Sequence, residues 1–201
     1  MRTALRCAAL GALAALLVPW PSPRAASAAA GKPLTAILIV ARPELPDPNF
    51  AGSVVLVMNN LGPAPVGIII NRPTAVSVAQ LFPDLKGLGR LHDKVYFGGP
   101  IGIGSVWYLV RTQAPPRHAI RTCEGVYLSA DREQLLELLH RKKPMEGLRI
   151  FVGHAGWAPG QLEGEIAHKD WTLEHAASTA IFGGKRDAPW PAAPPSAAPQ
   201  S

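Results

Sequence analysis

The stretch GHAGWAPGQLEGEI, Gly153–Ile166, gathers a histidine, a tryptophan, a glutamine and two glutamates within fourteen residues. Histidine is the side chain that changes charge near neutral pH, and a glutamate can act as its acid or base partner. His154 and Glu163 are therefore the candidates for acid–base catalysis. Trp157 offers a flat apolar face and Gln161 an amide, so the same stretch also suits binding without catalysis.

A cation from a distant part of the chain is expected to complete this site. Arg72, in IIINRPT, follows a predicted buried strand, and we expect it to form an ion pair with Glu163. Gly98 and Gly99, in YFGGP, mark another strand exit and are assigned to the same binding surface. Two interpretations stay open: a structural strand–turn–helix latch closed by a salt bridge, or a polar pocket beside Trp157.

Other reaction classes lack their sequence signatures. The chain has no GxSxG, no Gly-Lys-Ser/Thr phosphate loop and no HExxH. Glu165 and His168 share a helix face, but no second Glu-x-x-His pair completes a metal site, and the three histidines His154, His168 and His175 have no ligand spacing. Cys123, between basic residues, is interpreted as a lone, partly buried thiol. We therefore predict no metal and no cofactor.

The elements that must position these residues follow from hydrophobic periodicity and turn chemistry. Hairpins outnumber strand–helix–strand units, which predicts a single α+β domain with a mixed, mainly antiparallel sheet and about three short helices. The expected strands are Leu34–Ala41, Ser53–Met58, Val66–Asn71, Val95–Phe97, Ser105–Arg111, Val126–Leu128 and Leu148–Val152, with extended pieces at Trp171–Leu173 and Thr179–Phe182. The expected helices are Val76–Phe82, a helix capped by Ser129 that runs to Lys143, and Gln161–Lys169.

The two ends differ from the domain between them. Residues 1–28 combine early arginines, a short apolar run and Ala26-Ser27-Ala28, which is typical of a cleaved secretory signal peptide. Residues 29–33 form a short N-terminal segment, 34–182 the domain, and 183–201 a Pro/Ala-rich tail expected to be disordered. Removal of the signal leaves 20 − 3 = 17 basic and 14 acidic residues, a net charge of +3. The remaining positive charge is scattered along the sequence, so we expect no nucleic-acid partner, and the signal peptide predicts a periplasmic or secreted location.

Four segments together resemble the YqgE/AlgH family: LPDPNF, VGIIINRPT, YFGGP and GHAGWAPGQLEGEI, in this order. The resemblance implies a single domain with a sheet curled into a pseudo-barrel. It implies no activity, cofactor or catalytic residue, and one branch of the family is associated with transcriptional regulation. This chain departs from the family at His154, where a tyrosine is usual, and in its export signal.

The sequence thus favours a non-catalytic periplasmic binding or interaction module, with an unknown protein or small molecule as partner and no transmembrane span in the mature chain. Two alternatives remain. One is a hydrolase-like enzyme that uses His154 and Glu163. The other is a transcriptional regulator that binds nucleic acid, which the export signal disfavours.

Overall fold

The computed structural model of the chain describes residues 36–58 and 61–182. The predicted signal peptide, the segment 29–33 and the tail 183–201 lie outside these residues. None of the helices in the two described ranges combines the length and the apolar character that a bilayer crossing requires.

Ten strands and four short helices account for the regular structure of the described residues. In chain order they are β1 Ile37–Ala41, β2 Val54–Met58, β3 Val66–Ile69, β4 Pro73–Ser77, α1 Val78–Leu81, β5 Lys94–Phe97, β6 Ile101–Arg111, β7 Ile120–Cys123, β8 Val126–Ser129, α2 Arg132–Leu139, β9 Leu148–Gly156, α3 Gln161–Ala167, β10 Trp171–His175 and α4 Ser178–Phe182.

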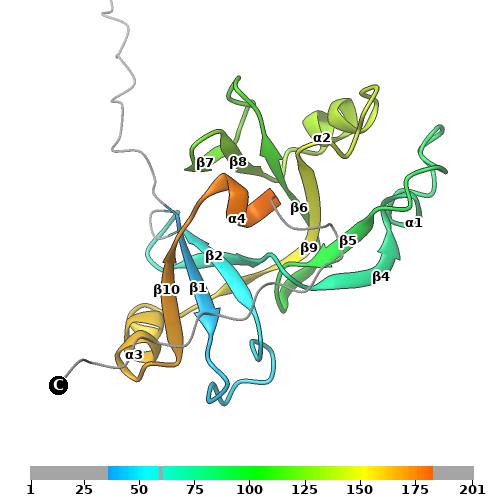
Figure 1. Cartoon of the computed structure of the whole chain (residues 1–201). Helices are drawn as coiled ribbons and strands as arrows, with labels where there is room; N and C mark the ends of the chain where they lie inside the picture. Colours follow the sequence, from blue (N-terminus) through cyan, green and yellow to red (C-terminus); the bar gives the residue numbers. More distant parts are fainter. Residues whose placement is uncertain (1–35, 59–60, 183–201) are drawn as a thin grey trace, which may run out of the picture. The chain divides into compact units, whose positions relative to one another are not determined.

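The strands form one curled sheet in the order β10-β1-β2-β3-β9-β6-β8-β7, with β5 joined to β9 and β4 to β5 (Figure 1). Every pairing is antiparallel except the parallel pair β5–β9. The two halves of the sheet approach each other, because the backbone N–H of Ala36, just before β1, donates to the carbonyl of Thr122 in β7 at 3.0 Å. The structure confirms the predicted α+β fold with a mixed, mainly antiparallel, curled sheet.

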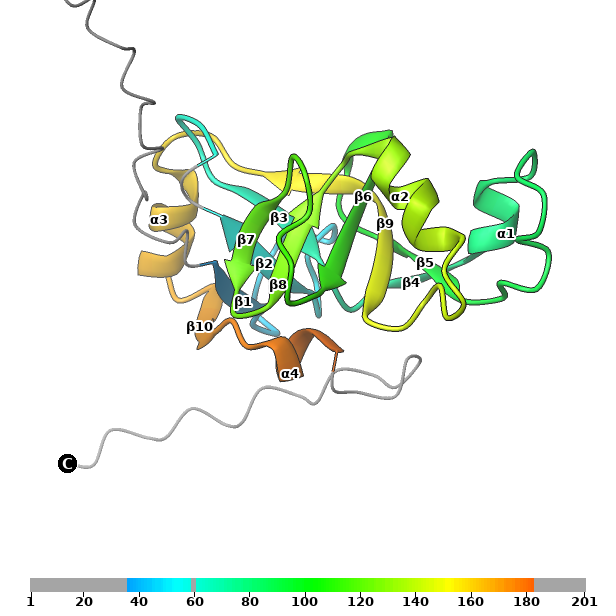
Figure 2. The ribbon, with the colours of Figure 1, turned by 90° about the horizontal axis from the view of Figure 1, so that it is seen from above.

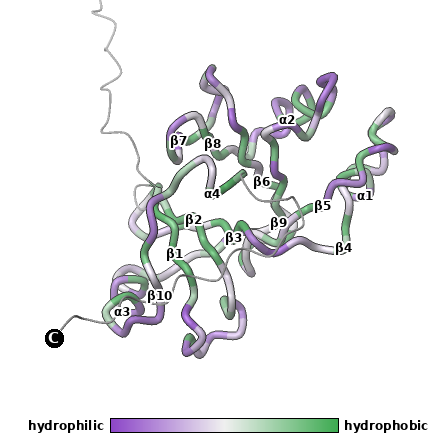
Figure 3. Tube along the Cα trace, in the orientation of Figure 1, coloured by the Kyte–Doolittle hydropathy of each residue, from purple (hydrophilic) through white to green (hydrophobic). Residues whose placement is uncertain are grey.

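Both faces of the central strands are covered, which explains their continuous apolar sequences. On β2, Val54, Leu56 and Met58 belong to the cluster inside the curl, whereas Val55 and Val57 belong to a second cluster on the opposite face. Successive side chains of a strand point to opposite faces, so a strand buried on both faces must be apolar throughout. Figure 3 shows β1, β2 and β3 as hydrophobic along their length.

Helix α4 lies across the curl of the sheet, as Figures 1 and 2 show from two directions. Its Ile181 is fully buried in the cluster inside the curl, next to residues of β1, β2, β6, β8 and β9. The sequence prediction was wrong here, since Thr179–Phe182 was expected to be extended. A segment of five residues is too short for periodicity to distinguish the two conformations.

Other boundaries also differ from the sequence prediction. Two strands, β4 and β7, were not expected, and their half-exposed sequences lack the apolar run that identifies the central strands. The second helix is capped by Asp131 rather than Ser129, because the Asp131 carboxylate accepts the Gln134 N–H at 3.1 Å. Ser129 is the last residue of β8 and is 1% exposed.

Candidate functional site

Strand β9 continues through Gly153 to Gly156, so the end of this strand that the sequence predicted at Val152 is wrong. Gly153 instead sits where the chain after β5 crosses β9. The N–H of Gly98 donates to the Val152 carbonyl at 2.8 Å, and the Gly98 carbonyl accepts from Ile69 N–H at 2.8 Å. A Cβ on Gly98 would collide with the Gly153 carbonyl oxygen, and one on Gly99 with the backbone of His154. These glycines permit close contact of two backbones rather than the opening of a cleft.

Trp157 is 5% exposed and belongs to an aromatic cluster. Its ring stacks on Phe50 with centroids 5.7 Å apart, and Phe50 meets Trp171 edge-on at 5.6 Å. Both indole N–H groups donate to one carboxylate oxygen of Glu165, from Trp157 at 3.0 Å and from Trp171 at 2.8 Å. The other Glu165 oxygen accepts from the Gln161 amide at 2.9 Å. Trp157 and Gln161 therefore hold helix α3 against the sheet.

Arg72 does not form the predicted ion pair with Glu163. Its guanidinium donates to the carbonyl of Asn49 at 2.7 Å and to that of Ala51 at 2.8 Å. These two carbonyls flank Phe50, so Arg72 fixes the loop that inserts Phe50 between the two tryptophans. Arg72 and Trp157 thus lie in one region, as the sequence suggested. The link between them is Phe50, whose neighbouring carbonyls bind Arg72 and whose ring stacks on Trp157, and not the expected salt bridge.

His154 and Glu163 are not brought together. Glu163 is exposed on helix α3 and, among the described residues, forms no ion pair with Arg72, while His154 lies at one end of the β6–β9 pairing, opposite Ile101. The His154 ring meets the edge of the Trp107 ring with centroids 5.8 Å apart. Among the described residues, neither His154 Nδ1 nor Trp107 Nε1 has a hydrogen-bond partner. The carboxylate that anchors this region is Glu165, which follows Gln161 by one helical turn.

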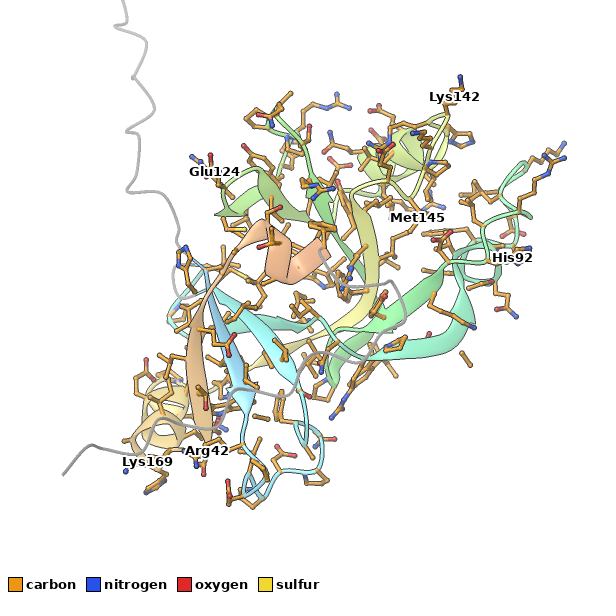
Figure 4. All side chains as sticks on the ribbon, in the orientation of Figure 1. Arg42, His92, Glu124, Lys142, Met145 and Lys169 are labelled. Atoms are coloured by element: carbon orange, nitrogen blue, oxygen red, sulfur yellow. The ribbon has the colours of Figure 1, made fainter. Side chains whose placement is uncertain are left out.

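A different part of the molecule contains a partly open cavity of about 270 Å³. It lies among the start of β5, the end of β6, the loop before β9 and helix α4. Its wall consists of His92, Asp93, Lys94, Tyr96, Arg111, Met145, Glu146, Gly147, Leu148, Arg149 and Phe182. None of the residues that the sequence assigned to a site lines it. In Figure 4, His92 and Met145 lie at the end of the domain remote from Arg42 and Lys169.

Two arginines face the ring of Phe182 in this cavity. The guanidinium carbon of Arg111 lies 5.4 Å from the ring centroid and that of Arg149 lies 5.9 Å from it. Arg149 also lies 5.2 Å from the Tyr96 ring and donates to the Ile70 carbonyl at 3.4 Å. Arg111, by contrast, has no carboxylate within ion-pair distance among the described residues. Within the described residues, the neighbour of this positive charge is therefore an aromatic ring rather than a carboxylate.

Arg111 also lines two shallower depressions beside the cavity. We call the three together the basic face. Their charged residues are seven basic ones and three acidic ones, an excess of 7 − 3 = 4, compared with a net charge of 17 − 14 = 3 for the chain without residues 1–28. The basic residues are Lys94, Arg111, Arg121, Arg141, Lys142, Lys143 and Arg149, and the acidic ones are Asp93, Glu124 and Glu146. The expectation of scattered charge is therefore wrong.

The run Arg141-Lys142-Lys143 was interpreted as the solvated end of a helix, and this holds for its first residue. Arg141 Nε donates to the Leu138 carbonyl at 3.1 Å, which caps helix α2. Lys143 pairs with Glu146 at 3.4 Å, and Lys142 extends from the top of the domain in Figure 4. The last two residues thus add charge to the basic face.

Cys123 is half-buried in the wall of one depression of the basic face. Burial raises the pKa of its thiol, and this outweighs the opposing influence of the Thr122 hydrogen bond and of Arg121. The interpretation as a lone, partly buried thiol is confirmed. Among residues 36–58 and 61–182, no three His, Cys, Asp or Glu side chains are grouped so that they could hold a metal ion.

Little in the sequence indicated the basic face. Its residues come from five segments between His92 and Phe182, and the arginines of β6 and β9 have no motif around them. One available signal was the position of Arg111 and Arg149, each a lone arginine at or within an otherwise apolar strand. Phe182 gave no signal, because it lies in the segment whose helix was missed.

The chain is a single-domain α+β protein with a curled, mainly antiparallel sheet, a close glycine contact between β5 and β9, and an aromatic cluster around Trp157. Comparison with protein-family models then identifies its family. A model described as AlgH-like (DUF179) matches residues 38–198, and the chain belongs to this family. The resemblance drawn from the four sequence segments is confirmed.

Relatives and solved structures agree. A UPF0301 protein from Nocardia farcinica is 33% identical over 163 residues, which cover 76% of this chain and 72% of that protein. One from Anaeromyxobacter dehalogenans is 33% identical over 162 residues, covering 76% and 82%. The solution structure of the AlgH protein from Pseudomonas aeruginosa superposes with a TM-score of 0.63 at 25% identity, covering 76% of this chain and 82% of that one. A crystal structure from Corynebacterium diphtheriae gives 0.58 at 28% identity, covering 75% and 80%.

Proposed function

We propose that the protein is an exported, non-catalytic binding module and that its binding surface is the basic face. The observation that carries this proposal is the Arg111 guanidinium, which lies 5.4 Å from the centroid of the Phe182 ring at the wall of a cavity. A cation that has no ion-pair partner in residues 36–58 and 61–182, and that lies beside an aromatic ring and a cavity, suits an anionic ligand or a partner with an acidic surface.

The arrangement of candidate catalytic groups supports binding rather than catalysis. A general base must lie within hydrogen-bond reach of the group that it deprotonates. His154 and Glu163 do not meet this condition, since one is in the β6–β9 pairing and the other is exposed on α3.

A serine, a histidine and an aspartate do lie close together at the start of helix α2, but their contacts differ from those of a hydrolase. His118 Nδ1 lies 3.0 Å from an Asp131 carboxylate oxygen. The Ser129 hydroxyl, however, donates to the His118 backbone carbonyl at 3.1 Å, and the serine is 1% exposed. A nucleophilic serine must donate to the imidazole and be open to substrate. The group instead orders the loop that enters α2.

Export is part of the proposal and rests on the sequence of residues 1–28. Cell fractionation of the full-length chain, with mass measurement of its N-terminus, tests this part. We expect periplasmic or secreted protein that begins near Ala28. If the protein is cytosolic and keeps an intact N-terminus, the proposed export is wrong.

Nucleic acid is the second candidate partner, because the basic face carries an excess of four positive charges. Export would separate the protein from the chromosome, so we favour the first candidate. A DNA titration at several salt concentrations decides between them, since phosphate contacts make the affinity fall steeply with salt. Tight binding with a steep salt dependence would favour nucleic acid.

The binding surface can be tested by photo-cross-linking in cells. A photoreactive residue at Gln113, in the wall of a depression shared with Arg111, should capture a partner that Arg111→Glu abolishes. The same residue at Lys169, which is exposed at the other end of the domain, is the matched control. Equal capture at both positions, or capture unchanged by Arg111→Glu, would reject the basic face as the binding surface.

A further inference from the structure

The cavity of the basic face is small and has two chemically different walls. Its volume of about 270 Å³ lies near the lower limit of roughly 300–1,000 Å³ seen for small-molecule sites. Phe182, Met145 and Leu148 supply apolar surface, whereas Lys94, Arg111 and Arg149 supply positive charge. This combination suits one compact molecule with an anionic head and an apolar body.

The side chain of Arg111 is constrained from two sides. The loop before β9 presses against its base, because Gly147 has φ 64° and a Cβ there would lie 3.3 Å from Arg111 Cβ. The backbone N–H of Arg111 also donates to the Gly147 carbonyl at 2.8 Å. At the other end, the guanidinium lies over the Phe182 ring, 5.4 Å from its centroid. A cation positioned before the ligand arrives loses little entropy on binding.

We propose that this cavity binds a small phosphate monoester, with the phosphate on the Arg111 guanidinium and the organic group against the Phe182 ring. The inference rests on the proposed function, because it names the ligand of the same surface. A guanidinium that meets a ring through one face keeps its in-plane N–H groups for a bidentate contact with phosphate oxygens.

The charge around the cavity favours a phosphate over a carboxylate. The wall of the cavity carries three basic residues and two acidic ones, Asp93 and Glu146, and the Glu146 carboxylate is paired with Lys143 at 3.4 Å. The rest of the basic face adds further cations, so the total excess is four. A phosphate monoester carries a charge of about −1.5 to −2 near neutral pH, whereas a carboxylate carries a single charge. The charge of a phosphate monoester therefore matches the four excess positive charges of the basic face better than the single charge of a carboxylate does.

The experiment is an isothermal titration of the purified mature protein with phenyl phosphate, inorganic phosphate and benzoate. We expect saturable binding of phenyl phosphate and weaker binding of the other two. Arg111→Gln should weaken phenyl phosphate about tenfold or more, since it removes a charge-assisted contact. Phe182→Leu should bring the affinity for phenyl phosphate down to that for inorganic phosphate, because the ring that holds the organic group is lost.

Arg42→Gln is the matched control. It removes the same charge from a half-exposed arginine that pairs with Glu44 at 3.6 Å and lies at the other end of the domain. We expect less than a twofold effect. If Arg42→Gln and Arg111→Gln weaken binding equally, phenyl phosphate responds only to the overall charge of the protein, and the proposed binding site at Arg111 is wrong. Thermal unfolding of each variant shows whether it is folded.

The probes also separate the two levels of the proposal. If benzoate binds as tightly as phenyl phosphate, with the same dependence on Arg111, the proposal of a phosphate ligand is wrong, while the proposed binding function of the basic face stands. No saturable binding of any probe, with cross-linking at Gln113 still dependent on Arg111, would overturn the small ligand but keep the basic face as a protein-binding surface. Failure of both experiments would reject the proposed function itself.

A phosphate monoester can be soluble or can be a lipid headgroup, and vesicle sedimentation distinguishes the two sources. Phosphatidylcholine vesicles containing phosphatidic acid should retain the wild-type protein but not Arg111→Gln if the source is a lipid. Binding of phenyl phosphate without sedimentation would identify a soluble ester. Retention by vesicles of phosphatidylcholine alone would contradict the role of the phosphate.

Discussion

Arg111, the last residue of β6, and Phe182, the last residue of α4, meet across the opening of the curled sheet with 5.4 Å between guanidinium and ring centroid. The contact depends on the fold as a whole, because α4 must first place Ile181 in the core inside the curl. Adjacent residues of one short helix thus have different roles. Ile181 anchors the helix, and Phe182 presents its ring to the basic face.

Substitutions at these two positions should separate stability from binding. Ile181→Ala should lower the free energy of unfolding by about 2–4 kcal/mol, because it leaves a cavity in a fully buried site. Phe182→Leu should cost about 1 kcal/mol or less, since Phe182 is half-buried and a cation–π contact contributes only about 0.5–1 kcal/mol at an exposed site. Urea unfolding of both variants provides the comparison. A larger loss for Phe182→Leu than for Ile181→Ala would show that the ring is structural.

Glu165 should be important for stability and Glu163 should not. Glu165→Ala leaves the indole N–H groups of two buried tryptophans without their acceptor, at a cost of about 1–3 kcal/mol. Glu163→Ala, on the exposed side of the same helix, is the control and should change the unfolding free energy by about 0.5 kcal/mol or less. Chemical denaturation followed by tryptophan fluorescence measures both. Equal losses for the two variants would contradict the assignment of Glu165 as the anchor.

Arg72 should be coupled to Phe50 and independent of Glu163. A double-mutant cycle of Arg72→Gln with Phe50→Leu should give an interaction free energy of at least about 0.5 kcal/mol, because the Arg72 hydrogen bonds fix the carbonyls on either side of Phe50. The cycle of Arg72→Gln with Glu163→Gln should give a value within about 0.3 kcal/mol of zero, as for sites without contact. A clear coupling in the second cycle would restore the salt bridge that the sequence suggested.

Stability should fall with acid through Asp131. The hydrogen bond from Gln134 N–H, and next that from His118, lower the pKa of this carboxyl below its ordinary value of 3.8. A lowered pKa in the folded state contributes stability above the unfolded pKa, and this contribution is lost as pH falls through the folded pKa. We therefore expect Asp131→Asn, which keeps a capping side chain, to lose less stability than the wild type between pH 5 and pH 2, about the range in which carboxyls titrate. Urea unfolding at a series of pH values measures this difference. Parallel pH profiles would exclude a contribution from Asp131.

The sequence predicted the fold better than the site, for physical reasons. Apolar runs such as those of β1 and β2 report burial directly, and the family segments identified the curled sheet. The half-exposed strands β4 and β7 carry a weaker signal and were missed. Distant segments do meet around Trp157, as the sequence suggested, but the expected ion pair of Arg72 with Glu163 does not form. Arg72 instead binds the carbonyls beside Phe50, and the carboxylate that binds the tryptophans is Glu165. Which of Glu163 and Glu165 faces the tryptophans depends on the angle at which α3 meets the sheet, and local sequence does not determine that angle.

The cavity could not be predicted from the sequence, because its chemistry exists only after folding. Arg111 and Arg149 become neighbours through the β6–β9 pairing, in which Leu109 faces Arg149. Phe182 joins them only when α4 crosses the sheet opening. Single arginines in three-dimensional proximity leave no spacing that a linear motif could detect.

The central claim is that ligands bind at the basic face rather than at the surface around His154 and Trp157 that the sequence predicted. An NMR titration of the ¹⁵N-labelled mature protein with phenyl phosphate tests it most directly. We expect saturable shifts at the backbone amides of Arg111, Gly147 and Phe182, with the indole signals of Trp157 and Trp171 unmoved. Shifts centred on His154 and Trp157, with Arg111 and Phe182 unaffected, would contradict the claim.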